Sequence, residues 1–301
     1  MAKRATRGKY HGFVVIEKPA GVTSHDVVGA IRRMTGERRV GHAGTLDPAA
    51  VGVLPIAVGL ATRTVEYLSE SDKGYLAEIT FGVTTDSLDG DGTVTEINDA
   101  TGVTLEQIEA VLPDFQGEIL QVPPMHSAIK IDGRPLYERA RRGEEIELDA
   151  RAVTIYMLEV VRWEHPVLEV FVHCSKGTYV RSLARDIGEA LSCGAYMSNL
   201  VRVSTGPFSL EDSWNLDELP VLIESGYWED IAAHPDAALY DRPAIVLGDD
   251  LAAKWRHGSV VPAEVPAGLV RVYDVFGNWL GVGSGDPEAG TVKPDKVVSE
   301  Q

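Results

Sequence analysis

The sequence predicts an α+β protein with a large N-terminal domain and a small C-terminal domain. Runs that alternate between apolar and polar residues, as half-buried strands do, are interspersed with segments whose apolar residues recur at helical spacing. At 301 residues, 44% of them hydrophobic, the chain is long enough for one large core and a second small one. Beyond Pro207 the composition becomes acidic and loop-rich, and short strands resume after Asp241.

Helix and strand signals in the N-terminal half are local and clear. An amphipathic helix is expected over residues 23–36, where an N-cap pair, apolar residues at helical spacing and a closing glycine follow one another: Thr23, Ser24, Val27, Val28, Ile31, Met34 and Gly36. Residues 76–81 alternate as a strand. A capping box at Thr104 begins a short helix that Pro113 is expected to stop.

The second half of the large domain predicts a hairpin followed by a helix. Two β-rich runs, 153–163 and 167–174, are separated by a short segment that contains a proline. Residues 180–191 carry apolar side chains at helical spacing and continue directly from the hairpin. Residues 134–143 predict another short helix with a basic outer face.

An acidic run at residues 86–92 separates the first strand from the capping box. Its clustered aspartates suggest calcium, but the run lacks the bidentate Glu that closes an EF-hand loop at the correct offset. We therefore expect a surface turn there and no metal site anywhere in the chain.

Composition limits the class of protein. No stretch approaches the roughly 20 apolar residues of a membrane span, and no signal-peptide core follows Met1, so a cytoplasmic protein without a membrane partner is expected. Cys174 and Cys193 are too few and too far apart for a metal clip or a disulfide scaffold. The net charge of −17 opposes nucleic-acid binding. However, residues 1–40 hold nine bases against three acids, whereas residues 201–301 hold seventeen acids against seven bases, so a basic face is expected beside an acidic back.

Asp47 lies in a glycine-rich frame that no ordinary helix or strand would choose. Backbone freedom or close approach is supplied by Gly41, Gly44 and Gly52. Pro48 fixes the backbone directly after Asp47, so we expect the position of the carboxylate to be constrained. An isolated Asp in such a turn usually bonds its own backbone, but the neighbouring motifs favour a functional interpretation.

Five segments carry a resemblance to a known family. They are KPAGVTS (18–24), GHAGTLDPAAVGVL (41–54), KGY (73–75), PPMHSAIK (123–130) and SKGTYVRSLARD (175–186). In this order and at these intervals they resemble the bacterial TruB-type tRNA pseudouridine synthases, over residues from about 12 to 298. The resemblance implies a pseudouridine-synthase-like catalytic domain, with a mixed, mostly antiparallel sheet flanked by helices and loops, and a small C-terminal β-barrel of the PUA-like type.

The expected organisation follows from this resemblance and from the composition. Residues 1–11 form a basic tail, residues 12–240 the catalytic domain and residues 241–301 the PUA-like RNA-binding domain. Within the last of these, short strands are expected at 269–273 and 279–282, joined by a turn.

The resemblance also implies the chemistry. The substrate is a uridine in the T-loop of tRNA, at position 55, which is isomerised to pseudouridine after the nucleotide has left the RNA stack. Asp47 is expected beside the sugar, as nucleophile or as base. Arg181 is expected to pair with it and to keep it ionised against the effect of burial. Tyr75 is expected to stack on the base or to assist proton transfer, two roles that the sequence does not separate.

Further residues are assigned to substrate binding, most of them by the resemblance and two basic residues as generic phosphate contacts. His42 helps to hold the opened RNA loop, and Lys18 and Pro19 brace the Tyr75 strand and the pocket floor. The remaining assignments are Tyr179, Leu200 as a pocket wall or a plain core leucine, and Lys130 and Arg141 as phosphate contacts.

Isomerisation gains and loses no atoms or electrons, so no cofactor is expected, and the chain has no nucleotide-binding fingerprint. The expected partner is tRNA through its T-stem-loop, without an obligatory protein partner or guide RNA. Two alternatives stay open: a non-catalytic RNA-binding or tRNA-folding protein, and an N-glycosidase that hydrolyses the same bond.

Overall fold

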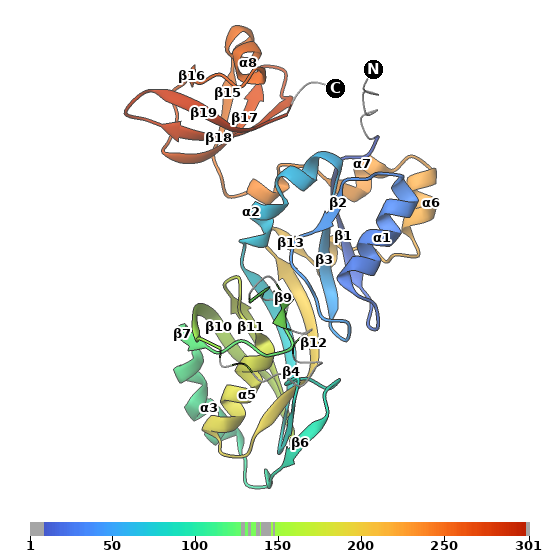
Figure 1. Cartoon of the computed structure of the whole chain (residues 1–301), viewed down its shortest axis with the longest axis vertical. Coiled ribbons are helices and arrows are strands. Elements are labelled where there is room, and N and C mark those ends of the chain that lie inside the picture. The colour runs from blue at the N-terminus through green and yellow to red at the C-terminus, as the bar shows by residue number, and fades with distance from the viewer. Residues whose placement is uncertain are drawn as a thin grey trace.

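The computed structural model describes residues 9–127, 130–131, 134–136, 139, 146 and 148–298. Its centre is a ten-stranded sheet in the order β14-β1-β3-β12-β4-β11-β10-β7, with β2 added beside β3 and β13 beside β12 (Figure 1). The strands are β1 (Gly12–Lys18), β2 (Val40–His42), β3 (Val51–Val58), β4 (Lys73–Phe81), β7 (Gly117–Gln121), β10 (Arg151–Glu164), β11 (Val167–Cys174), β12 (Ala195–Thr205), β13 (Phe208–Ser209) and β14 (Ala232–Ala233). Only the β3–β12 pair is parallel among them, which confirms a mixed, mostly antiparallel sheet.

The parallel β3–β12 contact joins two halves of the catalytic sheet. One half carries β1, β2 and β3 with helix α1 (Ser24–Thr35), and the other carries β4, β7, β10 and β11 with helices α3 (Leu105–Val111) and α5 (Val180–Ala190) (Figure 1). α5 packs on β12 and β4 through a face that includes Leu183 and Ile187, both fully buried. The segments that meet at this junction therefore come from both halves.

Several predicted elements are confirmed because their signals are local. α1 begins at a capping box in which Thr23 and Asp26 cap each other, and it ends at Gly36 with φ 69°. The predicted strand 76–81 belongs to β4, which begins three residues earlier, and the predicted hairpin is β10–β11. The helix predicted to begin at Thr104 and to stop at Pro113 is confirmed as α3, which ends at Val111; a 3₁₀ turn, η2 (Leu112–Phe115), follows with the proline in its first turn.

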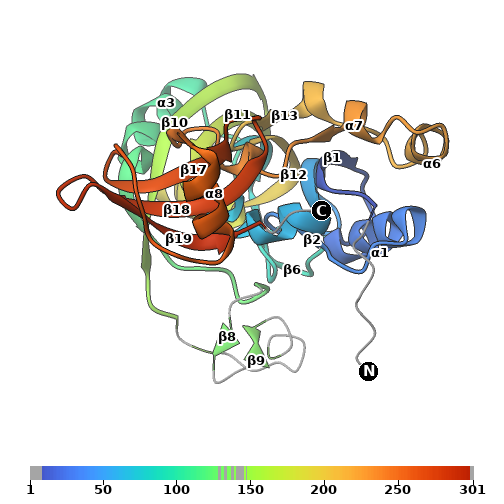
Figure 2. The ribbon, with the colours of Figure 1, turned by 90° about the horizontal axis from the view of Figure 1, so that it is seen from above.

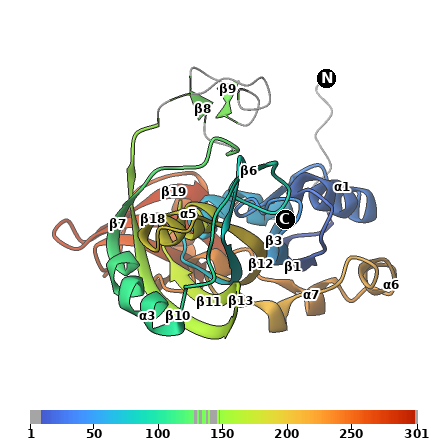
Figure 3. The ribbon, with the colours of Figure 1, turned by 90° about the horizontal axis from the view of Figure 1, so that it is seen from below.

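Smaller elements connect and flank the sheet. They are η1 (Gly59–Arg63), α2 (Val65–Ser69), β5 (Val83–Thr85), β6 (Val94–Ile97), β8 (Lys130–Ile131), β9 (Arg134–Pro135), η3 (Leu210–Asp212), α6 (Leu219–Glu224), α7 (Trp228–Ile231) and η4 (Ala237–Leu239). The β8–β9 ribbon lies apart from the main sheet in the views from above and from below (Figure 2 and Figure 3). The helix predicted over 134–143 is wrong at its start, since Arg134–Pro135 form β9. Leu136 and Arg139 are helical, and the rest of the predicted range lies outside the described residues.

The C-terminal segment forms a separate five-stranded sheet, β15-β17-β18-β19-β16, built from β15 (Ala244–Leu247), β16 (Val261–Pro262), β17 (Gly268–Asp274), β18 (Trp279–Asp286) and β19 (Thr291–Val297). Helix α8 (Asp249–Arg256) contributes the fully buried Trp255 to its core. The edge strands β15 and β16 do not pair, so the expected barrel is corrected to a half-barrel. It contacts the catalytic part through Leu60 and Tyr67, which pack against Trp279 and its neighbours, and through an ion pair between Lys296 and Glu66.

Candidate active site

A pocket of ≈ 290 Å³ lies where the two halves of the catalytic sheet meet. It is lined from the β2–β3 loop by Asp47, from β4 by Tyr75, from the start of α5 by Tyr179 and Arg181, and from β12 by Leu200. These five residues, predicted from four separate parts of the chain, are therefore brought together by the fold. Such a convergence of titratable and aromatic groups in one concave site is typical of an active site.

The loop that carries Asp47 is held by hydrogen bonds from several elements. Ser24 Oγ donates to the Leu46 carbonyl (3.1 Å) and accepts from the Leu46 amide (2.9 Å). The Lys18 ammonium donates to the Pro48 carbonyl at 3.0 Å. Because both neighbours of Asp47 are fixed, the position of its carboxylate is set by the scaffold rather than by its own rotamer alone.

Two of the three glycines in this loop have the predicted physical reason. Gly44 has φ 97° and Gly52 has φ 102°, in the region that favours glycine. A Cβ on Gly52 would stand 2.2 Å from the Arg202 carbonyl oxygen, so β3 reaches β12 this closely only without a side chain. Gly41 needs neither reason, since its φ is not positive and a Cβ there would meet open space.

Arg181 joins Asp47 to a second carboxylate. Its Nη2 lies 3.1 Å from Asp47 Oδ2 and its Nη1 lies 3.1 Å from Asp89 Oδ2. The same two nitrogens donate to the carbonyls of Ser87 (3.2 Å) and His126 (2.8 Å). Arg181 is 5% exposed, and four oxygen partners fix the forked geometry of its guanidinium.

Burial outweighs the guanidinium in setting the protonation of Asp47. The Asp47 side chain is 41% exposed through the pocket mouth. Desolvation by the surrounding protein nevertheless raises its pKa above the ordinary value, while Arg181 and Lys18 oppose this and Asp89 adds to it. The expectation that Arg181 reverses the effect of burial is therefore wrong in sign, because desolvation exceeds the opposing effect of Arg181 and the nearby Asp89 carboxylate adds to it.

Tyr75 and Leu200 form the apolar side of the pocket. Both are 8% exposed and belong to the main hydrophobic core, so the pocket and core interpretations of Leu200 hold together. Burial raises the pKa of the Tyr75 phenol, and the charge of Arg202 partly offsets this. Tyr179 caps the start of α5, where its amide donates to Gln121 Oε1 at 2.7 Å.

The other predicted binding residues lie at the margin of the site. Lys18 is fully buried and donates to the carbonyls of Pro19, Val22 and Pro48, so it braces the Asp47 loop rather than the Tyr75 strand; burial lowers its pKa to about 8. Pro19 is exposed and outside the pocket lining. His42 ends β2 beside the His25 ring, with a centroid distance of 5.4 Å, and burial lowers its pKa.

The structure does not describe the side chains of the two predicted phosphate contacts. Lys130 belongs to β8, and Arg141 lies outside the described residues.

Sequence reasoning missed Asp89, Lys73 and Arg202. Asp89 belongs to the acidic run that was interpreted as a surface turn, yet it pairs with Arg181. Lys73 lines the pocket, where its ammonium donates to the Ser69 and Ser71 carbonyls, and burial lowers its pKa to about 8. Lys73 stands in one of the five motif segments, but Arg202, on β12, gave no signal beyond its nearness to Leu200.

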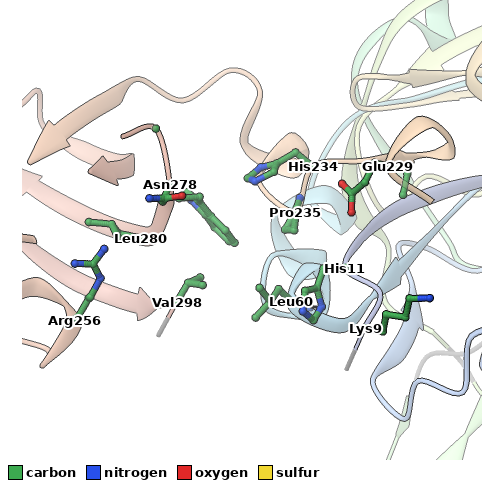
Figure 4. A pocket seen from close by; sticks show the side chains of 13 residues that line it. Lys9, His11, Leu60, Glu229, His234, Pro235, Arg256, Asn278, Leu280 and Val298 are labelled. Carbon is green, nitrogen blue, oxygen red and sulfur yellow. Dashed lines mark hydrogen bonds between the residues drawn. The ribbon is translucent and has the colours of Figure 1, made fainter. Parts of the chain in front are cut away.

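A larger cavity of ≈ 720 Å³ lies between the catalytic part and the half-barrel, where Asn278 and Leu280 face His234, Leu60 and His11 (Figure 4). Glu229 is the single carboxylate among the described residues that line it. The smaller pocket instead holds a carboxylate in an ion pair with a buried guanidinium, beside an aromatic ring, and is the stronger candidate for chemistry.

No cluster of His, Cys, Asp and Glu in the described part of the chain could hold a metal ion. No helix among those residues is long and apolar enough to span a membrane.

Comparison with known proteins gives a consistent set of matches. Residues 32–180 match the model of the TruB family pseudouridylate synthase N-terminal domain, residues 181–231 the tRNA pseudouridylate synthase B C-terminal domain, and residues 243–298 the pseudouridine synthase II TruB C-terminal domain. The chain is 41% identical to tRNA pseudouridine synthase B of Pseudomonas fluorescens over 300 residues, 98% of each chain. It is 41% identical to the protein of the same name from a Nostoc species over 290 residues, 95% of this chain and 98% of the other.

Solved structures show the same similarity. A chain of a Cbf5-Nop10-Gar1 complex matches with a TM-score of 0.75 and 29% identity, covering 96% of this chain and 85% of the other. A chain of an H/ACA RNP bound to a substrate RNA containing 2′-deoxyuridine matches with a TM-score of 0.73 and 27% identity, covering 95% and 84%.

Proposed function

We propose that this chain, which belongs to the TruB family of pseudouridylate synthases and isomerises uridine to pseudouridine in tRNA, acts on the uridine at position 55 of the T-loop. We propose Asp47 as its catalytic carboxylate. The observation that carries the assignment of Asp47 is its ion pair with a buried guanidinium at the wall of a pocket that also holds Tyr75. In a structural relative a substrate RNA occupies the complex, which supports a polynucleotide substrate for this pocket.

The reaction breaks the N1–C1′ bond of the uridine, turns the detached uracil while it stays bound, and joins C5 to C1′. The hydrogen on C5 leaves as a proton, and N1 gains one, so atoms and electrons balance without a cofactor. Ionised Asp47 acts on the sugar either as a nucleophile at C1′ or as a base toward a ribose proton. Arg181 holds the carboxylate in place for either role.

The pocket selects a nucleotide that has left the RNA stack. Its volume of ≈ 290 Å³ accepts a single base rather than a duplex. We propose that Tyr75 packs on the uracil ring and that Leu200 closes the opposite apolar wall while the base turns. Tyr179, which lines the pocket, and His42, at the end of β2 before the Asp47 loop, are assigned to the flanking nucleotides.

The charge distribution allows tRNA to dock despite the net charge of −17. Four buried cations, Lys18, Lys73, Arg181 and Arg202, surround the pocket or its loop, against the two carboxylates Asp47 and Asp89 that pair with Arg181, so basic side chains outnumber acidic ones there. We propose a catalytic domain at 12–240 and an RNA-binding domain at 241–301, acting on the T-stem-loop in the cytoplasm without guide RNA or protein partner.

The test is incubation of wild-type protein and Asp47→Ala with an unmodified tRNA transcript and no other protein, followed by mapping of pseudouridine at nucleotide resolution. The proposal expects modification at position 55 by the wild type alone. Release of free uracil would indicate an N-glycosidase, and equal modification by Asp47→Ala would remove Asp47 from the chemistry. A tRNA-binding protein without any product would indicate a folding role.

A further inference from the structure

Arg202 occupies the position where the two halves of the catalytic sheet are joined. On one side of β12 it pairs with Gly52 of β3 in parallel register, and on the other side it pairs with Tyr75 of β4 in antiparallel register. Its side chain is 1% exposed, among the largest fully buried side chains of the protein. One residue thus stands between the strand that follows the Asp47 loop and the strand that carries Tyr75.

The guanidinium of Arg202 binds both ends of the Asp47 loop. Nη2 donates to the Gly44 carbonyl at 3.2 Å and Nη1 donates to the Thr45 carbonyl at 3.4 Å, both before Asp47. Nε donates to the Val53 carbonyl at 2.8 Å, after Asp47. A planar group with fixed donor directions therefore sets the distance between the two arms of the loop.

The three acceptors of these Arg202 hydrogen bonds are neutral backbone carbonyls and bring no counter-charge to the guanidinium. A buried cation without a counter-charge is costly and is kept only where its hydrogen bonds are needed. The charge also acts on the Tyr75 phenol, whose pKa it lowers against the larger effect of burial. Arg202 thus hydrogen-bonds the backbone on both sides of Asp47 and lowers the pKa of the Tyr75 phenol. Its side chain is buried from bulk solvent.

We propose that Arg202 is a positioning residue, which holds the Asp47 loop and the Tyr75 phenol in one rigid frame during the isomerisation. The proposal rests on the proposed function of the pocket. The carboxylate has to keep its place beside C1′ and the ring its place against the uracil while the base turns between them. A displacement of about 1 Å at a reacting group can lower a rate by about a hundredfold.

The test compares Arg202→Lys and Arg202→Met with Ile108→Ala, a cavity variant in the same core. Ile108 is fully buried on α3, outside the pocket lining, so Ile108→Ala lowers stability without touching the site. Steady-state rates on unmodified tRNA, melting temperatures and hydrogen exchange of the 43–53 segment are measured for all variants. If Arg202→Met does not fold, Arg202→Lys carries the comparison.

The proposal expects kcat to fall by about tenfold or more in Arg202→Lys with KM unchanged, since a lysine reaches fewer of the three carbonyls. It also expects faster exchange of the 43–53 amides than in Ile108→Ala. It is overturned if kcat stays within threefold of wild type, or if rate and exchange change no more than in Ile108→Ala. A wild type that forms no pseudouridine would refute the proposed function instead, while the exchange measurement would still decide whether Arg202 holds the loop.

Discussion

Replacing Arg181 by lysine tests the arrangement that joins the two carboxylates. The change keeps the positive charge and removes the forked geometry. In the wild type, two nitrogens separately reach Asp47 and Asp89, each at 3.1 Å, and also two carbonyl oxygens. A lysine ammonium is a single point of charge and cannot hold both carboxylates in the same way.

The size of the effect follows from the hydrogen bonds that a lysine at this position cannot form. A hydrogen bond to a charged group contributes about 1.5–3 kcal/mol, and Arg181 is nearly fully buried, so solvent does not replace it. If Arg181→Lys removes one such hydrogen bond to Asp47 in the transition state, the rate falls by about ten- to a hundredfold, because about 1.4 kcal/mol corresponds to a factor of ten.

Single-turnover pseudouridine formation on an unmodified tRNA transcript measures this effect. Arg162→Lys is the control, because Arg162 is half exposed on β10, pairs with three glutamates away from the pocket, and such pairs contribute little. The reasoning is refuted if Arg181→Lys reacts within threefold of wild type, or if Arg162→Lys slows the reaction as much.

Three further predictions concern stability and pH. Asp47→Asn is expected to abolish activity while leaving the melting temperature unchanged or higher. The pKa of Asp47 is raised in the folded state, so its ionised form disfavours the fold at neutral pH, and a large fall in melting temperature would contradict this. Gly52→Ala is expected to destabilise the fold by at least about 1–3 kcal/mol in urea unfolding, because residue 52 has a positive φ and its Cβ would clash with the Arg202 carbonyl. Gly41→Ala is expected to be nearly neutral, and equal effects of the two substitutions would refute this explanation. In the pH–rate profile, the acid limb is expected above the ordinary carboxyl range because Asp47 must lose its proton. Activity is expected to decline above a pH of about 8 as Lys18 and Lys73 lose their charge. The pKa values of these lysines are lowered in the folded state, so the free energy of unfolding is expected to rise between a pH of about 8 and their ordinary pKa of 10.5. If stability fell together with activity in this range, the loss of activity could not be assigned to the loss of lysine charge.

The sequence predicted what local patterns determine. The α1 helix, the β10–β11 hairpin and the strand containing Tyr75 follow from caps and from apolar periodicity within a few residues. The motif resemblance identified Asp47, Tyr75 and Arg181, which the fold brings into one pocket.

What the sequence could not show depends on contacts between distant residues. Asp89 meets Arg181 across 92 positions, and Arg202 reaches the Asp47 loop across about 150. The sign of the Asp47 pKa shift depends on how much protein surrounds the carboxylate and on the sharing of Arg181 with Asp89. No periodicity in the chain encodes either quantity.

Release of tritium from tRNA labelled at C5 of uridine tests the central claim most directly, because C5 exchanges its hydrogen for C1′ only in isomerisation. We expect the wild type to release one tritium per tRNA with no free uracil, and Asp47→Asn to bind the tRNA equally well but release none. Tritium release by Asp47→Asn at the wild-type rate, or free uracil from the wild type, would contradict the account.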